Sequence, residues 1–299
     1  MSVRLGINPI TWSNDDLPEL GGDITLETCL AEARLAGFSG IEMGGKFPRE
    51  DGELSRLMAR HKLTLVSGWY DGRLLDLDLD KEWQALQAHL ELLRALGCTH
   101  IVYAETSRRS GGDLFAPISQ RPTLAAREWP HYGRRLSELA DRMQAFGVAM
   151  AFHHHMGTVV ETDAEVDCLM AETGPAVGLL FDSGHCAFSG GDPSALLRRH
   201  AGRVVHVHCK DVRRPVLDAV RRGDGSFMQA VLDGVFTVPG DGSLDFAAIL
   251  TSLRRSGYAG WLVVEAEQDP KKAHPLTYAR MGFNNLARMA LQAGFEIAP

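Results

Sequence analysis

The sequence contains few cysteines, and nothing in their spacing suggests that they act together. The five cysteines are odd in number and widely spaced, and no C-x-x-C occurs: Cys29, Cys98, Cys168, Cys186 and Cys209. We therefore expect neither a disulfide framework nor a zinc site made of thiolates. Reduced, mostly buried thiols are predicted instead.

Long apolar runs and excess positive charge are also missing. No stretch approaches the roughly 18 apolar residues of a membrane span, and the opening MSVRLGINPITW lacks a charged start followed by an apolar run. A cytoplasmic protein without a membrane partner is therefore expected. The net charge of −7 gives no attractive field for a polyanion, which argues against nucleic acid as a partner and favours a small molecule. Monomeric and homo-oligomeric states are both left open.

Several motifs of common enzyme classes are absent. No G-x-G-x-x-G opens a helix after a strand, no G-x-x-x-x-G-K-[ST] occurs, and no G-x-S-x-G nucleophile elbow is found. We therefore do not expect an enzyme that uses a dinucleotide cofactor or a serine hydrolase.

What the chain does contain is a regular alternation of short β-branched runs with longer amphipathic segments. The eight runs predicted as strands are VRLGI, FSGIEM, LTLVSGW, HIVYAE, VAMAFHH, VGLLFD, VVHVHCK and WLVVEA. Strand followed by helix, eight times, predicts a closed parallel (β/α)₈ TIM barrel. A chain of 299 residues accommodates one such barrel, so residues 1–299 are predicted to form a single domain.

Two segments are longer than ordinary connections between strand and helix. They cover about residues 107–130 and 212–242, and the second includes RRGDGSFMQAVLDGVFTVPGDGS. Both follow predicted strands, so both are expected as long loops over the carboxyl-end face of the barrel. They are candidate lids.

The later strands end in residues of the kind that bind metals. Asp182, His208 and Glu265 end or follow three neighbouring strands, and the carboxyl ends of barrel strands converge on one face. Two carboxylates and an imidazole form an oxygen and nitrogen pocket for a divalent cation. His153 is predicted as the fourth ligand, with Glu161 as the competing candidate. Mn²⁺ or Co²⁺ is expected first, and Mg²⁺ and Zn²⁺ fit the same ligands.

The neighbouring polar residues suggest a substrate rich in hydroxyl groups. Alternation along a strand gives His206, His208 and Lys210 a common side, and His206 is interpreted as a hydrogen-bonded interior residue. The ends of the early strands add polar and aromatic side chains that suit a hydroxylated ring. These predicted substrate-binding residues are Asn8, Trp12, Glu42, Trp69 and Glu105.

Three motifs together resemble the xylose-isomerase-like barrels, a superfamily of sugar isomerases, ketose epimerases and endonuclease IV-type enzymes. They are D-S-G-H at 182–185, H-V-H-C-K-D at 206–211 and V-V-E-A at 263–266. Within that group the opening GINPITWSNDDLPELGG, HHHMGT and TVPGDGSLDF are similar to the inosose dehydratases and their relatives in rhizopine catabolism. The resemblance spans essentially the whole chain.

The resemblance implies a ligand set and a reaction. Asp182, His208 and Glu265 carry over as metal ligands, and His185 and Arg214 fall where related epimerases contact substrate. The superfamily commonly has Glu at the end of the fifth strand, where His153 stands here.

The implied reaction is the loss of water from 2-keto-myo-inositol, a polyol ketone, to give a trihydroxycyclohexane-1,2-dione through an enediolate held by the cation. The candidates for its proton transfers are Lys210, His155, His185 and Glu161.

Three other functions compete with this hypothesis. A ketose epimerase or isomerase on the same barrel would return the proton instead of expelling hydroxide. An abasic-site endonuclease would need more ligands and a basic groove, which the acidic balance disfavours. A polyol-binding protein without catalysis would leave the ligand set unexplained.

Overall fold

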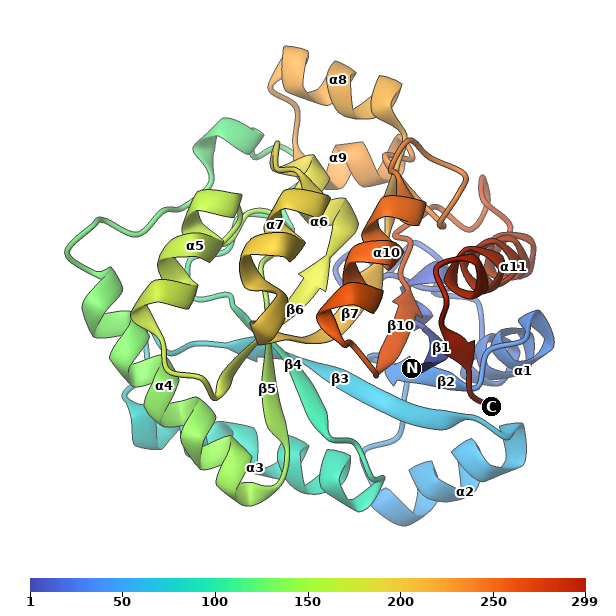
Figure 1. The fold of residues 1–299 in the computed structure, drawn as a ribbon, viewed down its shortest axis with the longest axis horizontal. Coiled ribbons are helices and arrows are strands. Elements are labelled where there is room, and N and C mark those ends of the chain that lie inside the picture. Colours follow the sequence, from blue (N-terminus) through green and yellow to red (C-terminus); the bar gives the residue numbers. More distant parts are fainter.

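The computed structural model describes residues 1–299, and its centre is a closed barrel of parallel strands (Figure 1). The eight barrel strands follow one another in chain order, and pairing of the last with the first closes the barrel. They are β1 (Ser2–Ile7), β2 (Gly40–Met43), β3 (Thr64–Gly72), β4 (His100–Glu105), β5 (Ala149–His153), β6 (Val177–Asp182), β7 (Val204–Cys209) and β10 (Trp261–Val264). The predicted barrel and its eight predicted strands are confirmed.

Helices surround the barrel and supply the outer layer of the fold. They are α1 (Leu26–Ala36), α2 (Asp51–His61), α3 (Leu79–Ala95), α4 (Trp129–Phe146), α5 (Asp163–Glu172), α6 (Ser183–Phe188), α7 (Pro193–His200), α10 (Phe246–Ser256) and α11 (Pro275–Gln292). Short 3₁₀ helices add Pro9–Thr11, Ile118–Gln120 and Ala201–Arg203. None of the helices has the length and apolarity needed to cross a bilayer. The last strand, β11 (Glu296–Ile297), pairs with β1, so the two chain ends lie side by side (Figure 1).

Helix α10 shows how local sequence sets these elements. The Asp245 carboxylate accepts a hydrogen bond from the backbone N–H of Ala248 at 3.0 Å and caps the first turn. Gly257 ends the helix in the left-handed region, at φ 85°. Between these signals, apolar residues at three- and four-residue spacing face the barrel: Phe246, Ile249, Leu250 and Leu253.

The segment at 212–242 differs from the predicted long loop. It folds into α8 (Arg214–Gly223) and α9 (Phe227–Leu232), flanked by the antiparallel pair β8 (Asp211–Val212) and β9 (Phe236–Thr237). These helices bury their apolar residues in a small cluster of their own above the barrel (Figure 1). Helices of 10 and 6 residues contain few turns, so their apolar spacing is too short to indicate a helix in the sequence. The segment 107–130 contains only the 3₁₀ turn at Ile118–Gln120 before α4 begins at Trp129.

The inside of the barrel is apolar at one end and polar at the other. Trp261 fills the amino end together with Val66 and Val263, and a Cβ atom on Gly40 would lie 2.6 Å from the Trp261 ring. Glycine at this position therefore leaves space for the indole. The buried carboxylates and imidazoles lie towards the carboxyl ends of the strands, where barrel enzymes place their sites.

Candidate active site

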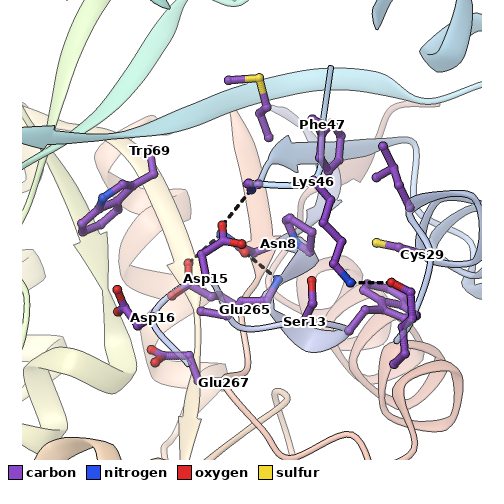
Figure 2. Close-up of a pocket in the computed structure, with 18 of the residues that line it drawn as sticks. Asn8, Ser13, Asp15, Asp16, Cys29, Lys46, Phe47, Trp69, Glu265 and Glu267 are labelled. Atoms are coloured by element: carbon purple, nitrogen blue, oxygen red, sulfur yellow. Dashed lines mark hydrogen bonds between the residues drawn. The ribbon is translucent and has the colours of Figure 1, made fainter. Parts of the chain in front are cut away.

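A cavity of about 430 Å³ opens at the carboxyl ends of the barrel strands. Figure 2 shows side chains from β3 and from the segments after β1, β2 and β10 directed towards it. Of the residues predicted from the sequence, it is lined by Asn8, Trp12, Trp69, His155 and Glu265. Its volume suits a small ring. Contact of Asn8, Trp12 and Trp69 with a substrate stays a prediction.

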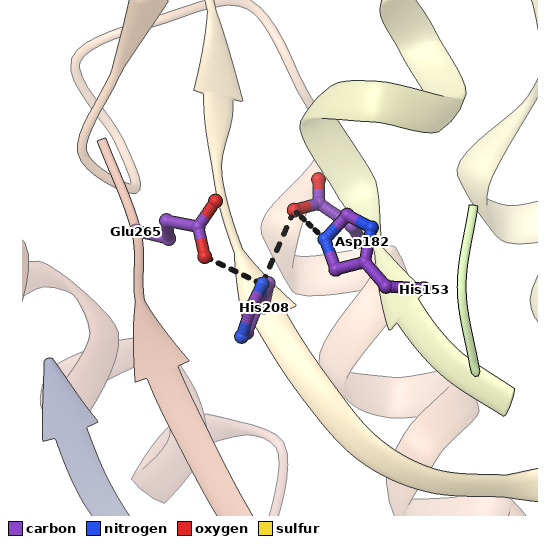
Figure 3. Close-up of side chains that lie close together, drawn as sticks. All are labelled: His153, Asp182, His208 and Glu265. Atoms are coloured by element: carbon purple, nitrogen blue, oxygen red, sulfur yellow. Dashed lines mark ion pairs between the residues drawn. The ribbon is translucent and has the colours of Figure 1, made fainter. Parts of the chain in front are cut away.

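Four side chains from different barrel strands converge at the base of this region (Figure 3). The Asp182 Oδ2 atom lies 3.6 Å from His153 Nε2 and 3.5 Å from His208 Nδ1. The Glu265 Oε2 atom lies 2.6 Å from the same His208 nitrogen. All four residues are buried, and one ligand atom from each lies within 4.8 Å of the others. The structure therefore brings the four predicted metal ligands together.

Asp182 divides its two oxygens between a helix and this cluster. Its Oδ1 atom accepts hydrogen bonds from the backbone N–H groups of Gly184 and His185, both at 2.8 Å, and so caps α6. Its Oδ2 atom has no hydrogen-bond partner, nor has either ring nitrogen of His153 or the Nδ1 atom of His208. Buried polar atoms without partners are rare and costly. Asp182 Oδ2, His153 Nε2 and His208 Nδ1 lie close together and form an oxygen and nitrogen set that fits a divalent cation.

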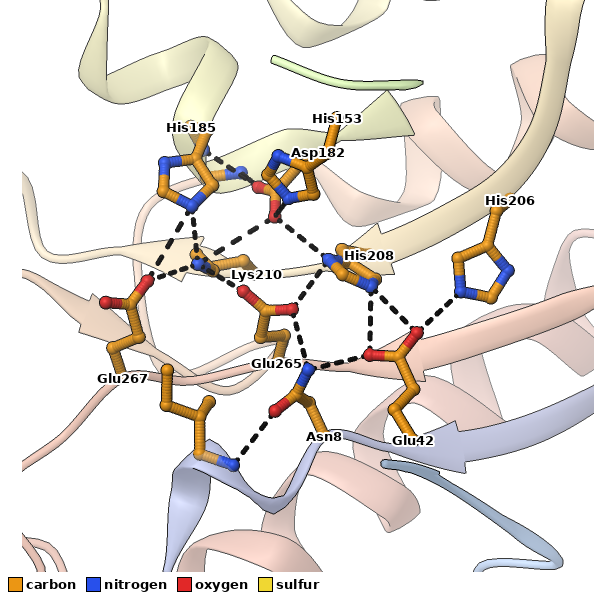
Figure 4. A network of polar contacts seen from close by, with 12 residues as sticks. Asn8, Glu42, His153, Asp182, His185, His206, His208, Lys210, Glu265 and Glu267 are labelled. Atoms are coloured by element: carbon orange, nitrogen blue, oxygen red, sulfur yellow. Dashed lines mark hydrogen bonds and ion pairs between the residues drawn. The ribbon is translucent and has the colours of Figure 1, made fainter. Parts of the chain in front are cut away.

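Glu42 lies beneath the four-residue cluster and does not line the cavity, so its contact with a substrate stays a prediction. Its carboxylate pairs with His208 Nε2 at 3.1 Å and His206 Nε2 at 2.8 Å, and it accepts from Ser67 and Asn8 (Figure 4). Burial raises the Glu42 pKa, but the two imidazoles outweigh it and hold that pKa well below its usual range. Glu42 therefore orients His208 through the nitrogen that faces away from the cluster. His206 is an interior hydrogen-bonded residue, as predicted.

Lys210 lies on the other side of the cluster and is fully buried. Its Nζ atom lies 2.6 Å from Glu265 Oε1, 2.7 Å from Glu267 Oε1 and 2.8 Å from His185 Nε2 (Figure 4). The aliphatic part of the side chain passes Gly184, where a Cβ atom would lie 2.4 Å from Lys210 Cγ. The glycine of the D-S-G-H motif therefore makes room for this lysine.

His155 is the predicted proton-transfer residue that lines the cavity itself. Its Nδ1–H donates to the backbone carbonyl of Met156 at 3.0 Å, which leaves Nε2 with a free lone pair. Burial lowers the pKa of the imidazole well below its usual value, so the ring is neutral. Its ring centroid is 4.3 Å from that of His185, which lies deeper. An unprotonated nitrogen at the cavity wall is suited to accept a proton.

Glu161 and Arg214 line neither the cavity nor the four-residue cluster, and their roles in proton transfer and substrate contact stay predictions. The Glu161 carboxylate accepts from the backbone N–H of Gly157 at 2.7 Å and lies 3.4 Å from Arg121 Nε. It belongs to no group of converging ligand atoms, so His153 is the fourth member of the cluster. Thr162 and Glu165 form a capping box at the start of α5, and Glu161 lies just before it. Arg214 is exposed at the start of α8.

Glu267 and Arg109 are two of the cavity-lining residues that were not predicted from the sequence. Glu267 lines the cavity two residues after Glu265, and strand periodicity carried past the end of β10 would have placed both on one side. Arg109, from the long segment after β4, pairs with Asp16 from the segment after β1. This ion pair joins two loops over the cavity, and no short-range sequence signal indicates it.

Glu105 also faces away from the cavity, towards α3 and α4. Its carboxylate accepts from the backbone N–H and hydroxyl of Ser107, and Glu82 and Tyr132 lie nearby. Burial raises the Glu105 pKa to about 7, and the neighbouring Glu82 adds to this effect. Glu105 therefore belongs to the packing between the barrel and its helices.

This position predicts a pH dependence of stability. A carboxyl group whose pKa is higher in the folded state stabilises the fold at low pH, and this contribution is lost as the pH rises through about 7. Glu105→Gln should thus raise the free energy of unfolding at pH 8 by up to about 3 kcal/mol, and change it little at pH 4. Urea unfolding at both pH values measures this. An equal change in the free energy of unfolding at both pH values would contradict the raised pKa of Glu105.

The two candidates for the fourth ligand can be separated by metal binding. His153→Ala removes one of the four converging ligands and should weaken Mn²⁺ binding at least about a hundredfold, since even residues behind the ligands are worth 10–100-fold. Glu161→Gln should bind Mn²⁺ as the unchanged protein does. Calorimetric titration of both metal-free variants gives the answer, and the reverse pattern would exclude His153.

Comparison with known proteins gives relatives over the whole chain. The model of the family described as xylose isomerase-like TIM barrel matches residues 30–288. The rhizopine catabolism protein MocC of Rhizobium meliloti is 62% identical over 100% of this chain and 92% of its own length. An inosose dehydratase of Geobacillus thermodenitrificans is 44% identical over 93% and 94%. The IOLI protein, whose structure has a bound zinc atom, superposes with a TM-score of 0.65 at 19% identity over 97% of each chain.

Proposed function

Because the chain belongs to the xylose isomerase-like TIM barrel family, and curated relatives at 41–44% identity are inosose dehydratases, we propose that it removes water from 2-keto-myo-inositol. The product would be a trihydroxycyclohexane-1,2-dione. The observation that supports this most is the convergence of His153, Asp182, His208 and Glu265 beside a ring-sized cavity. These four residues would hold a divalent cation, Mn²⁺ or Co²⁺ in the first instance.

The cation, when bound, would supply Lewis-acid polarisation of the substrate ketone. The protein then has to orient the ring, remove a proton next to the ketone and assist the departure of a hydroxyl group. Asn8 holds its amide towards Glu265 and Glu42, at 3.2 and 2.7 Å, so its position is fixed at the cavity wall. Trp69 packs edge-on against His153 and His155 and closes another wall.

The two proton transfers fall to different side chains. His155 is the proposed base, because its Nε2 lone pair is free and the residue lines the cavity. Glu267 also lines the cavity and accepts a hydrogen bond from Lys210 at 2.7 Å. This carboxylate and the ammonium group behind it are the proposed source of the proton that leaves with the hydroxyl group as water. His185 accepts from Lys210 and holds it in place.

One assay tests the reaction. Protein reconstituted with Mn²⁺ or Co²⁺ is incubated with 2-keto-myo-inositol, while ultraviolet absorbance and product mass are followed. The proposal expects a rising enone absorbance and a product lighter by one water. A product of unchanged mass would identify an epimerase or isomerase instead, and simple ketohexoses assayed in parallel would then reveal its substrates.

A further inference from the structure

A second group of ligand-type side chains lies next to the four-residue cluster, and the ammonium group of a lysine contacts two of its three members. One ligand atom from each of His155, His185 and Glu267 lies within 4.8 Å of the others. The Lys210 Nζ atom contacts two of the three, at 2.8 Å from His185 Nε2 and 2.7 Å from Glu267 Oε1 (Figure 4). All of these residues are buried. The ammonium group is thus held by donor atoms that also suit a metal.

Glu265 connects this lysine to the cluster. Its Oε2 atom faces His208 Nδ1 at 2.6 Å, and its Oε1 atom faces Lys210 Nζ at 2.6 Å. One oxygen of this carboxylate thus belongs to the four-residue cluster and the other contacts the ammonium group, as the two oxygens of a carboxylate that bridges a pair of metals would, and such metals lie about 3.5–4 Å apart. In this chain one of the two positions is taken by the protein itself.

We propose that the ammonium group of Lys210 stands in the place of a second divalent cation, so that the site binds one cation only. Three buried carboxylates lie within 4 Å of the Lys210 Nζ atom, those of Asp182, Glu265 and Glu267, while Glu42 is paired with His206 and His208. One divalent cation and one ammonium group balance their charge. Without the lysine the excess negative charge would be buried and uncompensated, which is costly enough to recruit another cation. The inference rests on the proposed function only for the position of the first cation.

Counting bound metal tests the inference. The metal-free protein is dialysed against saturating Mn²⁺, and the manganese retained per chain is measured by elemental analysis. The unchanged protein should retain one cation, and Lys210→Met should retain two, since methionine keeps the length of the side chain but not its charge. Spin coupling between the two manganese ions in the electron paramagnetic resonance spectrum of Lys210→Met should show that they are neighbours.

Two further variants make the count specific. Lys210→Met combined with Glu267→Gln removes a ligand of the second position and should return the count to one. Lys272→Met changes an exposed lysine that pairs with Asp269 and belongs to no group of converging ligand atoms, and this variant should also give one. Circular dichroism establishes that each variant is folded.

Two results would overturn the inference: two cations in the unchanged protein, or one in folded Lys210→Met. The first does not depend on whether any variant folds. Neither measurement uses a substrate, so an absence of dehydratase activity would remove the proposed function and leave this inference standing. If the unchanged protein shows dehydratase activity and binds two cations, the proposed function stands and this inference is wrong.

Discussion

Asp182→Asn is expected to lower the proposed metal-dependent turnover of 2-keto-myo-inositol more than about a thousandfold. Asparagine can still accept the hydrogen bonds from Gly184 and His185 that cap α6, but it replaces the free anionic Oδ2 atom by an amide group. Lewis-acid stabilisation is worth several kcal/mol, and each 1.4 kcal/mol is about tenfold in rate. Steady-state kinetics with saturating Mn²⁺, together with the manganese content, measure the effect. Asp182→Ala should lose activity equally and lose stability as well.

The matched control is Asp192→Asn. Asp192 caps α7 with the same geometry, accepting from the backbone N–H groups of Ser194 and Ala195 at 2.9 and 3.3 Å, but it lies outside the cluster. Its variant should retain full turnover and metal content. Substantial turnover in Asp182→Asn after removal of metal would contradict the role given to Asp182.

Asp211→Ala is expected to lower the free energy of unfolding by about 3–5 kcal/mol. Asp211 is fully buried and its two oxygens accept four backbone hydrogen bonds. Oδ1 takes the N–H groups of Val212 and Leu244, and Oδ2 takes those of Gly240 and Gly242, at 2.8–3.1 Å. Removing the carboxylate leaves these N–H groups without an acceptor. Each N–H group that water does not reach then costs about 1–3 kcal/mol. Urea unfolding measures the loss.

A graded series tests the same point. Asp211→Asn keeps one accepting oxygen and should lose about half as much stability as Asp211→Ala. The metal content of both folded variants should be unchanged, because Asp211 is not among the converging ligand atoms. Equal stability of all three proteins would contradict the role of Asp211 in anchoring the VPGDGS loop. This role also gives a physical reason for the last residue of the H-V-H-C-K-D motif.

The fold and the four-residue cluster could be predicted from the sequence because both follow from periodicity. Eight buried runs alternating with amphipathic segments allow few arrangements other than a barrel. Once the barrel is assumed, the ends of its strands meet on one face, so ligand-type residues at the ends of β5, β6 and β7 and directly after β10 must approach one another. That argument needs no knowledge of side-chain geometry.

The depth and direction of individual side chains could not be predicted in the same way. Glu42 points inwards but lies below the cation site, and the register shift of β2 between Ile41 and Met43 is not visible in the sequence. Glu105 ends a strand as Asp182 does, yet it faces the helices. Arg214 starts a helix whose partner is the small cluster above the barrel, so its side chain is directed to solvent. Arg109 meets Asp16 only through tertiary structure.

Anomalous scattering from crystals of the protein grown with Co²⁺ tests the central claim most directly. The claim predicts one strong peak at the cobalt absorption edge, about 2.0–2.2 Å from the ligand atoms of His153, Asp182, His208 and Glu265. A strong peak at another place in the barrel, or these four side chains without a peak between them at saturating cobalt, would contradict it.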